Sequence, residues 1–217
     1  MAEHLEPQFA EDEDLERAKK FWKENGRSIT AGVVLGLGAI AGYNGWNSWQ
    51  QSQGENASTL FETLSDPAVS DEAAEGLAND LKLDFSSSPY AAHGSFLMAK
   101  REVEAGNLDK ADTQLRWVLN NSKVEGIRHI ARLRLGMLLL AQQNDAGVLE
   151  LLQEVDGGES GGEFKARYFE IAGDAYALGG DIDAATKAYE RSQETQEPGS
   201  QSGALLKLKI ENLGKFK

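Results

Sequence analysis

Few residues of this 217-residue chain are suited to acid–base or metal chemistry, and they lie far apart. The chain has three histidines, His4, His93 and His129, and no cysteine. Zinc sites need several His, Cys, Asp or Glu ligands at short spacing, yet no acidic residue follows His93 or His129 by three or four positions. We therefore expect ordinary helix-surface histidines, no metal site, no catalytic residue and no enzyme activity.

Two glycine-rich stretches raise the possibility of nucleotide binding. Gly36-x-Gly38-x-x-Ala41 follows an apolar run and has the spacing of a dinucleotide fingerprint, but that fingerprint requires a βαβ unit and the rest of the chain has helical periodicity. The stretch Asp156 to Glu163 has no Gly-Lys-Ser/Thr element, so we interpret it as a flexible connector. Neither stretch predicts a bound cofactor.

The first element that the sequence predicts is a neutral helix. No Asp, Glu, Lys or Arg lies between Arg27 and Glu55, and the segment from Ile29 to Trp49 has the length of about 20 residues that crosses a hydrocarbon core. Aromatic residues, which favour the headgroup level, flank it on both sides. We expect a transmembrane helix over 29–49 in contact with the lipid bilayer. A signal peptide cleaved near Gly42 and a buried core helix are the alternatives.

Flanking charge predicts the orientation of this helix. Five cations precede it: Arg17, Lys19, Lys20, Lys23 and Arg27. After it no Lys or Arg occurs before Lys82. Because cationic flanks stay in the cytoplasm, we expect a cytoplasmic charged segment over 1–28 and an exported domain over 50–217.

Within the neutral helix, four glycines are spaced for close helix packing: Gly32, Gly36, Gly38 and Gly42. Small residues four apart let a second membrane helix approach, although glycine is also simply common in membrane helices. We expect these four positions to be membrane-helix packing sites.

The remainder of the chain repeats with a period of 37 residues. The turn sequences starting at Gly106, Gln143 and Gly180 align at this offset. Four more columns align with them: Ala99, Gly136 and Gly173; Ala111, Val148 and Ala185; Leu115, Leu152 and Tyr189; and Val118, Val155 and Ser192. A weaker upstream copy contributes Ala74, Ala78 and Leu81. The pattern predicts pairs of helices around tight turns, with the glycines as left-handed helix stops.

Local signals place individual helices. Ser88-Pro89 predicts a helix start at about Tyr90. The stretch from about Ile127 to Ala141 is apolar almost all round and is expected in the middle of the stack, and a last helix over about 202–213 should cover its end. With four prolines in the chain, the fold class is all-α. A net charge of −13 argues against nucleic acid as a partner.

The repeat resembles the tetratricopeptide repeat. The third unit matches its signature at Phe169, Ala172, Gly173, Tyr176, Gly180, Ala185 and Tyr189, although the period is longer than the usual 34. The resemblance implies a solenoid whose first helices line a groove for an unfolded or basic amphipathic segment. The implied groove residues are Phe96, Lys100, Val103, Ile130, Leu133, Met137, Leu140, Glu170, Asp174 and Ala177. For Leu133 and Leu140 a core position is the alternative.

The chain as a whole resembles the YfgM family of ancillary SecYEG translocon subunits. The resemblance lies in "KFWKENGRSITAGVVLGLGAIAGYNGWNSWQ", in the third repeat and in "LLKLKIENL". It implies a single-pass protein of the bacterial inner membrane, with a periplasmic tetratricopeptide-like domain over 50–217. The resemblance also implies association with the SecYEG translocon and a PpiD-like periplasmic chaperone. Such a protein is expected to be a non-enzymatic adaptor that helps unfolded exported clients reach chaperones. A repeat scaffold for another envelope complex, in division or secretion machinery, is the alternative.

Overall fold

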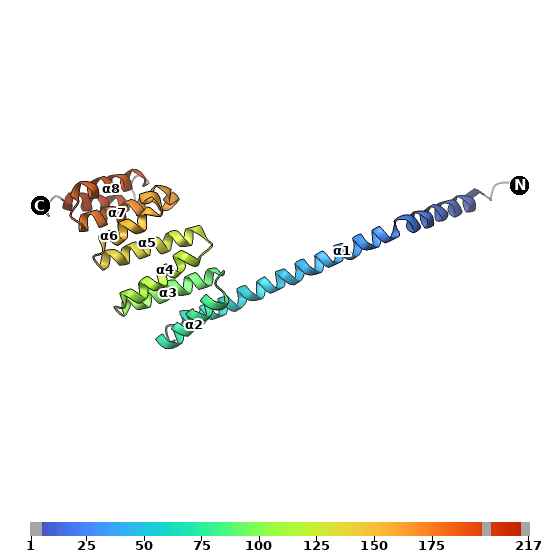
Figure 1. The fold of residues 1–217 in the computed structure, drawn as a ribbon, viewed down its shortest axis with the longest axis horizontal. Coiled ribbons are helices and arrows are strands. Elements are labelled where there is room, and N and C mark those ends of the chain that lie inside the picture. The colour runs from blue at the N-terminus through green and yellow to red at the C-terminus, as the bar shows by residue number, and fades with distance from the viewer. Residues whose placement is uncertain (1–5, 197–200, 214–217) are drawn as a thin grey trace. The chain divides into compact units, whose positions relative to one another are not determined.

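The computed structural model describes residues 6–196 and 201–213, and all elements in these ranges are helical. His4 lies outside the described residues. The chain forms two compact units, Met1–Glu55 and Asn56–Lys217. The first helix, α1 (Glu6–Ser65), runs through both (Figure 1).

In the first unit, α1 exposes its apolar side chains. From Val33 to Trp49 the large apolar side chains are 53% to 74% exposed, and an 18-residue window of mean hydropathy 1.2 has no buried residue. By length and composition, this helix is a candidate membrane span.

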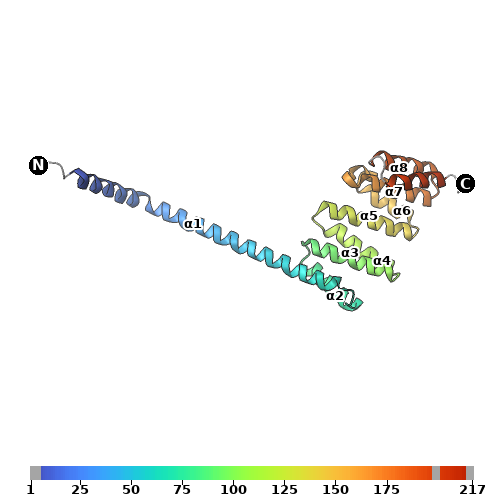
Figure 2. The ribbon, with the colours of Figure 1, turned by 180° about the vertical axis from the view of Figure 1, so that it is seen from behind.

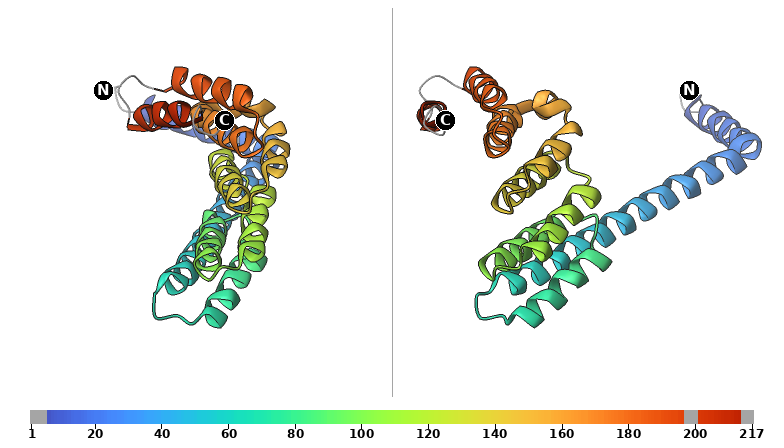
Figure 3. Two further views of the ribbon diagram at one scale, coloured as in Figure 1. Left: turned by 90° about the vertical axis from the view of Figure 1, so that its left-hand side faces the viewer. Right: turned by 60° about the vertical axis from the view of Figure 1, so that its left-hand side comes forward.

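The second unit is a stack of helices that begins with the last turns of α1. Figures 1 and 2 show the successive helices side by side, and Figure 3 views the same ribbon from two further sides. The helices that follow α1 are α2 (Asp71–Asp84), α3 (Pro89–Glu104), α4 (Leu108–Asn121), α5 (Glu125–Ala141), α6 (Asp145–Gln153), α7 (Lys165–Leu178), α8 (Ile182–Glu194) and α9 (Gln201–Leu213). A 3₁₀ segment, η1 (Asp156–Phe164), joins α6 to α7. The prediction of an all-α repeat domain behind an apolar helix is confirmed.

The columns of the 37-residue repeat form the core. Every residue in the four columns is buried, on α3, α5 and α7 or on the second helices and the residues just after them. The upstream copy is buried too, since Ala74, Ala78 and Leu81 are at most 2% exposed on α2. The period therefore marks the side chains at which neighbouring helices touch.

At each of three turns of the repeat, one residue adopts the left-handed backbone conformation. Gly106 has a φ of 79°, Gln143 of 57° and Gly180 of 82°. At each turn two backbone bonds close the helix end; at the middle one, Gln143 N–H donates to Leu140 O at 2.9 Å and Asn144 N–H donates to Leu139 O at 2.9 Å. This is the Schellman arrangement. Gln143 thus adopts a left-handed conformation for which the other two turns have glycine, the residue that adopts it without steric cost.

The helix boundaries follow the local signals. Ser88 caps α3 by accepting from Tyr90 N–H at 3.2 Å, and Pro89 is the first helical residue. The predicted helix at about 127–141 is α5, and the predicted final helix is α9. Leu206 and Leu213 of α9 are buried with Ala185 and Tyr189 of α8, so α9 covers the last repeat.

The glycine-rich segment is not the flexible connector that its composition suggested. Gly157, Gly158 and Gly162 adopt positive φ angles in compact turns, and Gly158 and Gly161 are buried. A Cβ at Gly158 would lie 2.8 Å from that of Tyr168. The glycines therefore let η1 pack closely on α7.

Candidate functional site

The second unit has a groove between α3 and α5, with α4 at its back. Its volume is about 640 Å³. Whereas α5 packs on α7, α3 and α5 are not in close backbone contact along their length, and the space between them remains open to solvent. The groove therefore lies between two helices that are joined by side chains at its base and not by close backbone packing.

The lining of the groove is mainly apolar. Val103 on α3 and Met137 on α5 are 46% and 44% exposed, a large fraction for apolar side chains in a folded unit. Phe96, which is 7% exposed, and Leu115 of α4 lie among the lining residues. An apolar side chain brought by a partner would be removed from water here, which is the usual driving force of docking.

Two cations and one acid also line the groove. On α3, Lys100 Nζ lies 3.7 Å from Glu104 Oε1, and both side chains are mostly exposed, so this pair is weak. On α5, the guanidinium carbon of Arg134 lies 4.4 Å from the centroid of the Phe96 ring. Arg134 is exposed and has no ion-pair partner among the side chains that the structure describes.

Of the predicted groove residues, the structure brings together Phe96, Lys100, Val103 and Met137 at this groove. Ile130, Leu133 and Leu140 are partly buried and pack against the main core, so the core alternative fits Leu133 and Leu140. The sequence interpretation missed Arg134, although this position directly follows a predicted groove residue in the same helix.

The predicted acidic part of the groove is occupied from within the chain. Lys209 of α9 donates to Glu170 Oε1 at 3.0 Å and to both carboxylate oxygens of Asp174, at 2.7 and 2.8 Å. Arg167 donates to the second oxygen of Glu170 at 2.6 Å. Glu170 is only 5% exposed, and Ala177 packs in the α8–α9 cluster. The expectation that Glu170, Asp174 and Ala177 line an open groove is wrong, because α9 covers them.

Tyr189 of α8 belongs to the same ionic cluster. Its hydroxyl donates to Asp174 Oδ1 at 2.7 Å. Burial raises the pKa of Tyr189 far above its ordinary value of 10.0, and the hydrogen bond to Asp174 and the negative charges of Asp174 and Glu170 raise it further. The hydroxyl therefore remains a proton donor throughout the neutral range.

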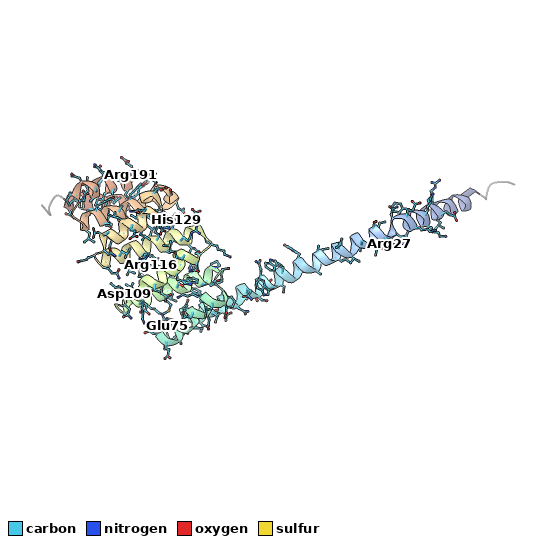
Figure 4. All side chains as sticks on the ribbon, viewed as in Figure 1. Arg27, Glu75, Asp109, Arg116, His129 and Arg191 are labelled. Atoms are coloured by element: carbon cyan, nitrogen blue, oxygen red, sulfur yellow. The ribbon has the colours of Figure 1, made fainter. Side chains whose placement is uncertain are left out.

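The two described histidines, His93 and His129, have different surroundings. His93 is exposed, with its ring near those of Phe61 and Phe96. His129 is 8% exposed, against the expectation of a surface position. Its Nδ1 lies 2.7 Å from the Tyr168 hydroxyl, and its ring stacks on that of Phe164. Figure 4 labels His129 on α5, within the stack. It is a hydrogen-bonded core residue.

Among the described residues, no group of three or more His, Cys, Asp or Glu side chains is placed to hold a metal ion. The fingerprint-like glycines Gly36 and Gly38 lie inside the continuous helix α1 and follow no strand. A nucleotide fingerprint requires a strand before the glycines, so the local structure contradicts that possibility.

One catalytic spacing escaped the sequence interpretation. Gly158-Glu159-Ser160-Gly161-Gly162 matches the Gly-x-Ser-x-Gly pattern of a hydrolase nucleophile. That motif works on a sharp strand-to-helix turn, whereas here it lies on η1 between two helices. Ser160 Oγ donates to Asp156 Oδ2 at 2.5 Å, a capping-like contact within the segment. Both Ser160 and Asp156 are exposed, on a turn of η1.

Comparison with known proteins agrees with this architecture. A family model described as a tetratricopeptide repeat-like domain matches residues 19–215. A protein of Haemophilus influenzae named "Ancillary SecYEG translocon subunit" is 30% identical over 205 residues, covering 94% of this chain and 97% of its own length. Proteins of the same name from Neisseria gonorrhoeae and Escherichia coli are 29% and 28% identical, covering 98% and 94% of this chain and 100% and 96% of their own lengths. No solved structure matches the chain.

Proposed function

Because the chain belongs to the family of ancillary SecYEG translocon subunits, with their tetratricopeptide repeat-like domain, we propose that it is a membrane-tethered, non-enzymatic adaptor of the SecYEG translocon. The observation that carries this proposal is the extent of the likeness. The relatives match 94% to 98% of the chain, so the likeness includes both the apolar helix and the repeat stack. Each part has a role in such an adaptor.

The apolar part of α1 is the membrane anchor in this proposal. Its exposed apolar side chains would be costly in water and are suited to lipid. The cations between Arg17 and Arg27 favour a cytoplasmic amino end, which leaves the repeat unit on the periplasmic side of the inner membrane. A reporter enzyme fused after Lys217 that is active only in the periplasm tests this orientation; activity of a cytoplasmic reporter at that position contradicts it.

In this proposal, the repeat unit binds other proteins in the periplasm. We assign to its groove the reception of unfolded exported clients, and to the unit as a whole the contact with a PpiD-like periplasmic chaperone. The exposed apolar lining between α3 and α5 supports client binding. Helical-repeat stacks have extended binding surfaces because successive repeats pack side by side.

In the anchor, we assign contact with a membrane helix of the translocon to Gly32, Gly36, Gly38 and Gly42. Within the described part of α1, a Cβ at any of the four would meet nothing within 4 Å, so this face of the helix has room for a second helix. Small residues at spacing four are suited to close helix association in lipid.

The test is co-purification with SecYEG from membranes. Replacing Gly36 and Gly42 by Leu fills the small face without disturbing α1, because the space there is open. We expect recovery of SecYEG with the chain to fall several-fold. The matched control carries Val33→Leu and Ile40→Leu, which leave the small residues in place.

Recovery of SecYEG that is equal for both double variants would contradict the packing sites. Recovery of division or secretion components in place of SecYEG, with the unaltered chain, would contradict the translocon assignment itself and favour an envelope scaffold. Site-specific crosslinks from position 36 to channel subunits would support the translocon assignment directly.

A further inference from the structure

We propose that the groove between α3 and α5 receives an acidic amphipathic segment of a partner protein, with apolar side chains in the groove and carboxylates on its rim. The inference deepens the client-binding role and rests on it. It reverses the charge preference that the sequence suggested, which was for a basic segment.

The reversal follows from where the charges lie. The acids that would attract a basic segment, Glu170 and Asp174, are paired with Lys209 and covered by α9. What remains at the open groove is one cation on each wall, Lys100 on α3 and Arg134 on α5, with a single acid, Glu104. The chain has a net charge of −13, whereas the charged residues that line this groove sum to one positive charge.

Arg134 is the stronger of the two cations for this purpose. Its guanidinium lies over the face of Phe96, an arrangement that orients the planar group while its N–H edge remains able to donate. A carboxylate can accept two parallel hydrogen bonds from that edge. Lys100 already has Glu104 within 3.7 Å, so a partner carboxylate would have to share it.

The apolar lining of the groove favours a partner segment that also has apolar side chains. Val103 and Met137 are exposed on opposite walls, and methionine adapts its shape to different side chains. A volume of about 640 Å³ accommodates several Leu- or Phe-sized side chains. A segment with apolar residues on one side and Asp or Glu beside them satisfies both the lining and the rim.

Binding of two probe peptides to the full-length chain in lipid nanodiscs tests the proposal. Both peptides carry the same leucine face and a fluorophore; one has Glu and the other Lys at the flanking positions. At low salt we expect the Glu peptide to bind about fivefold more tightly, since exposed charge pairs are modest in strength. The preference should fall as ionic strength rises.

Variants connect the preference to the groove. Arg134→Glu should remove or reverse the preference for the Glu peptide, and Met137→Asp should weaken binding of both peptides. The matched control is Lys207→Glu, which makes the same change in net charge at an exposed position of α9. It should leave the preference in place. Circular dichroism of each variant establishes that the stack remains folded.

Equal affinity for the two peptides, tighter binding of the Lys peptide, or no binding of either overturns the proposal. A preference that Lys207→Glu abolishes as completely as Arg134→Glu does also overturns it, since the effect would then come from overall charge. These outcomes are separate from SecYEG co-purification, which depends on the anchor, so either proposal can fail alone.

Discussion

Lys209 on α9 holds Asp174 on α7 through both carboxylate oxygens, at 2.7 and 2.8 Å. The same ammonium also donates to Glu170, one of the few charged side chains in the described core. The contact joins the last helix to the last complete repeat by charge as well as by apolar packing. It also explains why the third unit has no open acidic groove.

Replacing Lys209 by Met should loosen α9. The change leaves the nearly buried Glu170 with Arg167 alone and Asp174 with Tyr189 alone, and removing one member of a partly buried ionic cluster costs about 2–3 kcal/mol. Hydrogen exchange of the α9 amides should become much faster than in the unaltered chain. Lys207→Met, at an exposed neighbouring position, is the control, and unchanged exchange in Lys209→Met would refute the role of the contact.

A methyl group at Gly173 should destabilise the stack, whereas one at Gly136 should not. A Cβ at Gly173 overlaps the Tyr189 ring, which is fixed by its bond to Asp174; we expect Gly173→Ala to cost about 2 kcal/mol. A Cβ at Gly136 would lie 3.1 Å from Ile171 Cγ2. There a small shift suffices, and the better helix propensity of alanine, about 1 kcal/mol, offsets it.

Denaturation midpoints of the two glycine variants in the same detergent measure this difference. The two positions belong to one column of the repeat, in which the first unit already has alanine, Ala99. If Gly136→Ala and Gly173→Ala lose equal stability, the close approach of Tyr189 is not the reason for glycine at 173.

Gln143→Gly should stabilise the protein. The left-handed φ of 57° at this turn is strained for glutamine and free for glycine. Since the side chain of Gln143 is exposed and little contact is lost, we expect a gain of about 1 kcal/mol, measured as a higher melting temperature. Gln142→Gly is the control, because Gln142 has a φ of −81° and glycine there should lower stability. A lower melting temperature in Gln143→Gly would contradict the strain.

The contribution of the Tyr189 hydroxyl should disappear at alkaline pH. The pKa of Tyr189 is raised in the folded chain above its ordinary value of 10.0, so its stabilising effect is complete below pH 10 and declines as the pH rises further. At pH 8, Tyr189→Phe should be about 1 kcal/mol less stable than the unaltered chain. Above pH 10 the difference should shrink by up to about 1.4 kcal/mol per pH unit. Urea midpoints at pH 8 and above pH 10 check this, and a difference that grows with pH would contradict the assignment.

The stack was predictable from sequence because each repeat uses the same buried positions. Columns such as Ala111, Val148 and Ala185 are visible in the printed chain, and all three are fully buried. The turns are predictable from local sequence as well, because Gly106 and Gly180 indicate helix ends with a left-handed residue. Gln143 has no such local signal, and only its alignment with these two glycines indicates a turn there.

The groove was less predictable because it depends on contacts between distant segments. Glu170 and Lys209 lie far apart in the sequence, and nothing local in either indicates that they pair. The gap between α3 and α5 likewise results from how successive repeats stack, which a repeat period does not specify. At η1 the glycine-rich composition predicted a flexible connector. In the structure, the glycines instead allow close packing on Tyr168.

The position of α9 implies an order of events in folding. Because α7 and α8 precede α9 in the chain, they emerge before it from the ribosome or from a translocation channel. Until α9 follows and docks, Tyr189 and Ala185 lack the cover of Leu206, and Glu170 and Asp174 lack their lysine. A chain that folds as it emerges therefore presents a temporary acidic and apolar face.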